Sequence, residues 1–226
     1  MPSHPDFALW IVSVVTEAFV CGLILLRGRL RRYRMLACYF GGCALVESVQ
    51  VMIFLHYGIS SMDYLYLYYY ADSLLGLLLY FAVVEHFGCV CDSSAERRYV
   101  RVGSFLLAVG VGIFCCVLVA RSPASIINRL VAEYSQYLFY ATAALGLGMF
   151  VTSLRNRRVL LHDRLLAFVF ASYLALMPWQ YLLRRLYPGF RSIIYTHALV
   201  WMLLLLGVAY IFSDPATGKD EPCIYL

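Results

Sequence analysis

Long apolar runs alternate with short polar segments along the whole chain. Seven runs can be marked, at about 7–26, 35–56, 64–87, 102–121, 134–154, 165–186 and 195–213. A helix needs roughly 20 apolar residues to cross the hydrocarbon core of a bilayer, so each run is long enough to be a transmembrane helix. Short connections favour antiparallel packing of consecutive helices. The pattern predicts an all-α, polytopic integral membrane protein, in which one domain of seven transmembrane helices is followed by a short tail at 214–226.

Composition strengthens this prediction and limits the kinds of function. Of the 226 residues, 63% are hydrophobic and only 14% are charged, which is far from the average soluble domain. No soluble domain of useful size remains, so any chemistry must lie within the helices or on short loops. The chain has no P-loop, no G-x-S-x-G and no H-E-x-x-H motif. We therefore assign no catalytic residue and do not expect an enzyme, although paired carboxyl groups within a membrane could serve one.

The basic residues predict an orientation. Loops after the first, third and fifth runs and the tail hold 13 Lys and Arg, whereas the opposite side holds 5. Basic residues in short loops favour the cytoplasmic side. We expect the N-terminus outside and the tail in the cytoplasm, in a multi-pass protein of the plasma (bacterial inner) membrane. Because the net charge of +5 is explained by this anchoring, we do not expect nucleic-acid binding.

Three acidic residues lie near the middle of the first three runs, at Glu17, Glu47 and Asp72, with no Lys or Arg at matching depth. At 1.5 Å per residue, all three could share one depth in a bilayer. Consecutive helices are usually neighbours, so the acids could line one polar pocket. Ionisable groups within a membrane are costly to keep, and by default they indicate a path or site for an ion, a proton or a ligand.

Polar neighbours extend the predicted pocket. Gln50 lies almost one turn from Glu47, and Tyr68, Asp72 and Gly76 follow i, i+4 spacing on one helix face, which brings a phenol beside a carboxyl group. Together with the adjacent Tyr69, the predicted pocket consists of Glu17, Glu47, Gln50, Tyr68, Tyr69 and Asp72, from the first three helices.

A plainer interpretation of the acids stays open. Each carboxyl group could be protonated or hydrogen-bonded to Tyr, Ser or backbone, and so merely fix helix packing. Thr16 and Ser48 would add hydroxyl groups to either arrangement. The two interpretations differ in whether the acids lie together.

The sixth and seventh runs offer weaker candidates. Pro178 removes a backbone hydrogen bond and should kink its helix, either for packing alone or as a hinge. Arg184 and Arg185 follow at the expected outer mouth, where they could extend to the interface or bind an anionic group. Trp179 and Trp201 lie deeper than an interfacial Trp usually does, so they could anchor the helices or face a ligand.

Cysteine and histidine give no sign of a metal or cofactor. Most of the 8 Cys fall within the apolar runs, where Cys behaves as a small hydrophobe. Cys89 and Cys91 form a C-x-C without further ligands nearby, so no metal site and no cofactor is expected. Glu85-His86 at the inner end of the third run is expected to be a solvated pair, or alternatively the inner step of a proton path.

Small residues predict close helix packing, because they let two backbones approach. They are grouped in the fourth run (Gly103, Gly110, Gly112) and the fifth (Ala144, Gly146, Gly148). The outer connection at 122–135 is expected to form a short interfacial helix of its own. A shift of 130 residues aligns parts of the first three runs with the last three, which leaves open an internal duplication.

Two functions follow from these patterns. The first is a membrane protein that binds or transports a small solute, an ion or a proton through the carboxylate and tyrosine pocket among the first three helices. The second is a non-transporting sensory or accessory subunit that associates with lipids and with a partner membrane protein or further copies of itself. If the three acids point to different sides of the bundle, the first function loses its main support, whereas the second does not depend on their direction.

Overall fold

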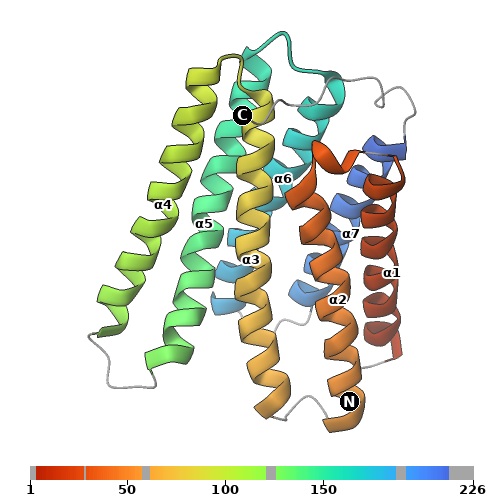
Figure 1. The fold of residues 1–226 in the computed structure, drawn as a ribbon. Helices are drawn as coiled ribbons and strands as arrows, with labels where there is room; N and C mark the ends of the chain where they lie inside the picture. The colour runs from red at the N-terminus through yellow and green to blue at the C-terminus, as the bar shows by residue number, and fades with distance from the viewer. Residues whose placement is uncertain (1–3, 28, 58–61, 121–125, 187–191, 214–226) are drawn as a thin grey trace.

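The computed structural model describes residues 4–27, 29–57, 62–120, 126–186 and 192–213, with side chains left out at 4–9, 62–65, 69, 126–128, 177–186 and 192–198. Of the residues that it describes, 93% are helical and none forms a strand. Seven α-helices run up and down in these segments (Figure 1). The predicted all-α fold of seven helices is confirmed.

The helices extend beyond most of the apolar runs. They are α1 (His4–Leu26), α2 (Arg34–Tyr57), α3 (Met62–Val90), α4 (Ser94–Ala120), α5 (Ile126–Arg155), α6 (Leu161–Leu186) and α7 (Ser192–Ser213), with a 3₁₀ turn η1 (Arg29–Arg31) before α2. The prediction of a separate interfacial helix at 122–135 is wrong, because the chain belongs to α5 from Ile126 onward. No Pro or Gly interrupts 126–134, so the helix continues without a break.

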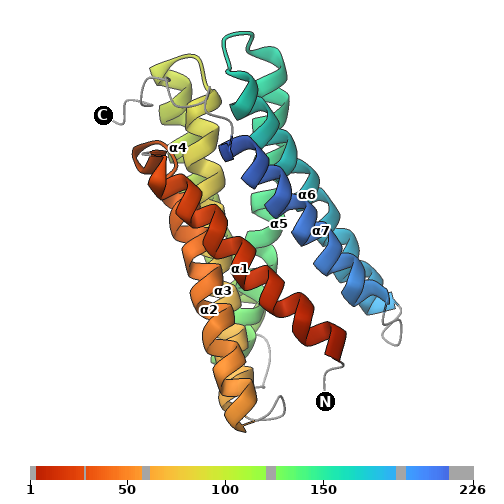
Figure 2. The same ribbon diagram turned by 90° about the vertical axis from the view of Figure 1, so that its right-hand side faces the viewer.

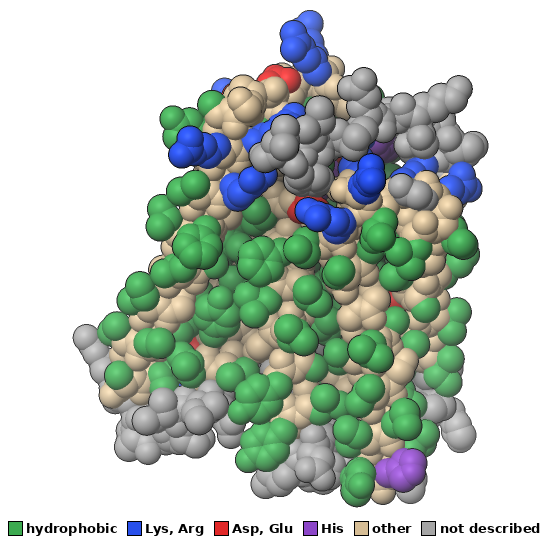
Figure 3. Space-filling model, viewed as in Figure 1, with side chains coloured by type: hydrophobic (Ala, Val, Ile, Leu, Met, Phe, Trp, Pro, Cys, Tyr) green, Lys and Arg blue, Asp and Glu red, His purple; other side chains and the backbone are tan. Residues whose placement is uncertain are grey.

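Within the fully described residues, four helices are long and apolar enough to cross a membrane, with spans at Arg34–Tyr57, Tyr66–Val90, Ser94–Ala120 and Arg129–Arg155. The described parts of α1 and α7 contain shorter apolar helices, at Trp10–Leu26 and Leu199–Ser213. In Figure 3 the side of these helices is covered by hydrophobic side chains, and Lys and Arg gather at one end. That end holds the α1–α2, α3–α4 and α5–α6 connections (Figure 1).

Six of the helices form a closed ring, and α4 lies outside it. In order around the ring, α1 packs on α2, α2 on α3, α3 on α5, α5 on α6, α6 on α7, and α7 again on α1. The helix α4 packs only against α3 and α5 among these main contacts. Figure 2 shows α6 and α7 diverging from α2 and α3 toward the end at which the chain begins.

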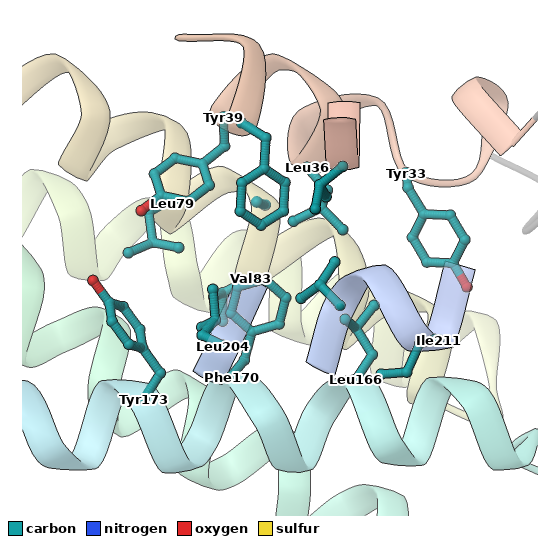
Figure 4. Packing of buried hydrophobic residues seen from close by; sticks show 14 of the residues in the cluster. Tyr33, Leu36, Tyr39, Leu79, Val83, Leu166, Phe170, Tyr173, Leu204 and Ile211 are labelled. Atoms are coloured by element: carbon teal, nitrogen blue, oxygen red, sulfur yellow. The ribbon is translucent and has the colours of Figure 1, made fainter. Parts of the chain in front are cut away.

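The core lies where α2, α3, α6 and α7 face one another (Figure 4). Leu36, Val83, Phe170, Leu204 and Ile211 are buried there. Two buried tyrosines from α2 and α6 lie at one end of the labelled cluster, and the tyrosine that precedes α2 lies at the other (Figure 4). The apolar core therefore separates two polar ends.

The start of α4 shows how local sequence places a helix. The Ser93 hydroxyl accepts a hydrogen bond from the Glu96 N–H at 3.1 Å, and the Glu96 carboxylate accepts the Ser93 N–H at 3.4 Å and the Asp92 N–H at 3.1 Å. This is a capping box, which satisfies N–H groups that the first turn cannot pair itself. Helix α4 therefore begins soon after α3 ends, at the Arg-rich end.

Only part of the predicted small-residue packing is present. A Cβ atom added at Gly146 would lie 2.8 Å from Cδ1 of Leu174 and 3.9 Å from the Ala171 backbone, so α5 and α6 approach closely there. Gly103 and Gly110 have nothing within 4 Å of such an atom. They lie away from helix contacts because α4 is peripheral, so the prediction is wrong for these two glycines.

This difference predicts unequal effects of the same substitution. Gly146→Leu should lower the free energy of unfolding by about 1–3 kcal/mol, because the larger side chain has no space between α5 and α6. Gly103→Leu, the matched control, should not destabilise the protein. Thermal unfolding of both variants in detergent micelles measures the difference, and equal stability of the two would contradict the described α5–α6 contact.

Candidate acidic site

Glu17 of α1 is fully buried and holds together two helices that are far apart in sequence. Its Oε1 accepts a hydrogen bond from the Trp201 indole N–H of α7 at 2.8 Å, and one from the Ser13 hydroxyl at 3.3 Å. The same indole N–H lies 3.1 Å from the Ser13 oxygen. Ser13 is itself buried, one turn before Glu17. One oxygen of the Glu17 carboxyl group is thus well satisfied by donors.

Glu47 of α2 completes the site. Its half-buried side chain lies within hydrogen-bonding contact of the Glu17 carboxyl group. Within the described part of the chain, Oε2 of Glu17 and Oε2 of Glu47 are both buried and accept no N–H or O–H hydrogen bond. Buried polar atoms in proteins rarely lack a hydrogen-bond partner. The two acids therefore form a pair, and the hydrogen that could join their carboxyl groups is an acid proton.

The α2 face that carries Glu47 supplies more of the site. Tyr39, Cys43 and Glu47 follow i, i+4, i+8 spacing and so share one helix face. Tyr39 and Cys43 are both buried. Both also interact electrostatically with Glu17. The site therefore combines two carboxyl groups with phenol, thiol, hydroxyl and indole groups from α1, α2 and α7.

Aromatic rings enclose the indole that binds Glu17. The centroid of the Trp201 ring lies 5.2 Å from that of Tyr173, 6.1 Å from that of Tyr39 and 6.3 Å from that of Phe40. Aromatic pairs at such separations make favourable tilted or edge-to-face contacts. Figure 4 shows Tyr39 and Tyr173 together at the same end of the core. These contacts hold the indole N–H in place toward the acids and exclude water from that side.

Asp72 does not join this pair. Its Oδ2 accepts a hydrogen bond from the Ser135 hydroxyl of α5 at 2.8 Å. A Cβ atom added at Gly76 would lie 3.9 Å from the same hydroxyl oxygen, so Asp72 and Gly76 do share a face, as their spacing predicts. That face points toward α5 because α3 packs there as well as on α2. The prediction of one pocket formed by all three acids is therefore corrected to a pair, with Asp72 elsewhere.

Other predicted pocket residues lie outside the pair or outside the described side chains. Gln50 is half-buried, and no hydrogen bond joins it to either acid in the described structure. Tyr68 is 44% exposed, and the side chain of Tyr69 is not described. The Thr16 and Ser48 hydroxyls donate to backbone carbonyls one turn back in their own helices, so they do not extend the site.

The predicted hinge and outer mouth are only described as backbone. Helix α6 continues through Pro178 to Leu186. The side chains of Pro178, Arg184 and Arg185 lie outside the described residues, and so does that of Trp179. Their roles as a hinge and an outer mouth stay predictions.

A second polar cluster, at the Arg-rich end, was not predicted. Asp163 in the first turn of α6 is 2% exposed and pairs with Arg32. Its Oδ1 also accepts a hydrogen bond from the Tyr33 hydroxyl at 2.8 Å. His86 of α3 donates its Nε2–H to the Asp163 backbone oxygen at 3.1 Å. The signal in the sequence was one Asp at a helix start within an Arg-rich loop.

Glu85 and His86 are buried, which corrects the expectation of a solvated pair. The Glu85 side chain is 8% exposed, and its Oε2 accepts the Met35 N–H at 2.8 Å. That N–H belongs to the first turn of α2, where the helix has no acceptor of its own. His86 is 3% exposed beside Asp163. Both residues join α3 to its neighbours, which solvated side chains would not do.

Groups at this end outside the helical spans have altered acidity. Burial raises the pKa of Tyr33 well above its usual range, and the Asp163 carboxylate raises it further. Burial, with a smaller contribution from Glu96, raises the pKa of Cys91 to about 11. Both groups therefore stay protonated at neutral pH. In the described residues, no three His, Cys, Asp or Glu lie close enough to hold a metal ion.

Loss of the Asp163 charge should destabilise the protein. Asp163→Asn removes one partner of a buried ion pair and leaves Arg32 without its carboxylate, which typically costs about 3 kcal/mol or more. Asp92→Asn, in the exposed turn before α4, is the control and should change stability by less than about 0.5 kcal/mol. Chemical unfolding in micelles measures both, and an Asp163 variant as stable as the control would contradict the buried pair.

The acidity of Cys91 predicts slow alkylation in the folded protein. Since the thiolate is the nucleophile, a thiol with a pKa of about 11 has only roughly a thousandth of its population reactive at pH 8. In a variant that keeps Cys91 alone, maleimide labelling should be at least about 100-fold slower than after denaturation, and should accelerate as the pH rises toward 11. Equal rates in the folded and denatured states would contradict this.

Comparison of the chain with protein-family models, curated proteins and solved structures finds no match, so the case for its function rests on the geometry described above.

Proposed function

We propose that this chain is a multi-pass membrane protein, with its N-terminus outside and its Arg-rich end in the cytoplasm, that binds or moves a small cationic species at Glu17 and Glu47. The predicted pocket among helices 1–3 is revised to one formed by α1, α2 and α7. The observation that carries the proposal is a fully buried acid beside a second acid, with no basic side chain in contact with either in the described structure.

Electrostatics favour a cationic cargo. Two carboxyl groups side by side cannot both be charged at low cost in an apolar interior. A bound cation or proton removes that cost, whereas an anion would increase it. Uptake of a positive species is therefore the simplest way for this site to become satisfied.

The Arg-rich end supports access from the opposite side. There, Asp163 joins α6 to Arg32 and Tyr33 before α2, and Asn156 donates a hydrogen bond to the Val90 carbonyl at the end of α3 at 2.9 Å. Arg27 donates to the Ser213 carbonyl at the end of α7 at 3.0 Å. These contacts tie the helix ends together, and Figure 2 shows α6 and α7 leaning away from α2 and α3 at the other end. Entry from the outer side is thus part of the proposal.

Transport into sealed vesicles tests this function. In vesicles with a pH- or cation-sensitive dye inside, Glu17→Gln and Glu47→Gln should each lower the initial uptake rate by about tenfold or more, equivalent to ~1.4 kcal/mol or more. Asp72→Asn is the matched control, because this acid also lies in an apolar span but binds Ser135, and it should retain uptake.

Unchanged uptake in both Gln variants would contradict the proposal. If the wild-type protein moves no ion but binds a membrane protein that is lost from the Gln variants, the accessory-subunit function would replace it.

A further inference from the structure

The two unsatisfied carboxyl oxygens show which cation the site takes. Oε1 of Glu17 already accepts the Trp201 and Ser13 donors, whereas Oε2 of Glu17 and Oε2 of Glu47 receive none in the described structure. The neighbouring Glu17 and Glu47 carboxyl groups are in contact. A single proton placed on one carboxyl group lets it donate to the other, which provides a partner for both unsatisfied groups at once.

We infer that the cargo is a proton, carried on Glu47 and donated as a hydrogen bond to a Glu17 carboxylate. This rests on the proposed function and names its substrate. Glu17 is the member that stays ionised, because an N–H and an O–H donor both point at it and stabilise a negative oxygen. Glu47 shares only the Ser13 hydroxyl and receives no indole N–H, so it is the member that gains and loses the proton.

The surroundings fit a proton better than a metal ion. Calcium takes about six to eight oxygen ligands, but besides the two carboxyl groups the site offers one hydroxyl, one indole N–H, a phenol and a thiol, from Ser13, Trp201, Tyr39 and Cys43. The indole N–H cannot act as a ligand, because it is a donor only. The rings of Tyr39, Phe40 and Tyr173 pack against Trp201 and fill the space on that side.

The titratable groups around the pair do not supply a competing charge. From α2 these are Tyr39 and Cys43, and from α6 it is Tyr173, which faces Tyr39. The groups that α7 and α1 contribute are the indole of Trp201 and the hydroxyl of Ser13, which do not titrate. Phenols and thiols are neutral when protonated. The change of charge at this site therefore falls on the two carboxyl groups.

Infrared spectroscopy of the purified protein tests this inference directly. The C=O stretch of a protonated carboxylic acid is separate from that of a carboxylate, so the wild type should show one such band that Glu47→Gln removes. Asp72→Asn should leave this band unchanged. Glu47→Asp keeps an acid at the position and should retain a shifted band, which separates loss of the proton from loss of the fold. Deprotonation at high pH should also change Trp201 fluorescence, and Trp201→Phe should abolish that change.

Two results would overturn the inference. The first is the absence of a Glu47-dependent acid band at every pH at which the protein is folded. The second is a Trp201 signal that responds to sodium at constant pH, which would keep the proposed cation function and replace the proton. A Glu47-dependent band in a protein that shows no flux would support the proton pair and reject transport.

Discussion

Each carboxyl group buried in this apolar bundle needs a hydrogen-bond partner, and that requirement determines which helices meet. Glu17 binds Trp201 and contacts Glu47, which joins α1 to α7 and α2. Asp163 joins α6 to the segment before α2. Asp72 is exposed, but its hydrogen bond with Ser135 likewise joins α3 to α5. Leucine and phenylalanine side chains pack as well against lipid as against each other. In a membrane, apolar contacts alone therefore specify only weakly which helices are neighbours. The acids supply specificity, since a carboxyl group that is buried without a hydrogen-bond partner is costly.

The two polar ends differ in what they can do. At the Arg-rich end, the acid Asp163 meets a fixed positive charge on Arg32 and a phenol donor on Tyr33, so its negative charge is compensated within the protein. At the other site, Glu17 meets a second acid and two neutral donors. A compensated charge stabilises one arrangement of helices, whereas the uncompensated pair is where we propose that a positive species binds. The apolar core around Phe170 and Val83 separates them.

The sequence predicted the helices well and the site only in part. Seven apolar runs became seven helices, because a run of about 20 apolar residues has few other ways to satisfy its backbone. The position of each acid along its apolar run also predicted its depth, and so predicted that Glu17 and Glu47 lie at the same level. The sequence does not show toward which neighbouring helix each acid points, so the predicted pocket grouped Asp72 with the wrong residues. Trp201 contacts α1 because α7 packs against α1 and closes the ring of six helices. The i, i+4, i+8 spacing of Tyr39, Cys43 and Glu47 is a signal in the sequence from which this face of α2 could be predicted.

The central claim is that Glu17 and Glu47 act as one unit and Asp72 does not. A double-mutant cycle on unfolding stability in micelles tests it most directly, with Gln at positions 17 and 47 and Asn at position 72. Residues in direct contact typically couple by about 0.5–3 kcal/mol, whereas distant ones add within about 0.5 kcal/mol. We expect coupling between positions 17 and 47 and additivity between either of them and position 72. Additive effects at 17 and 47, or coupling of both to 72, would contradict it.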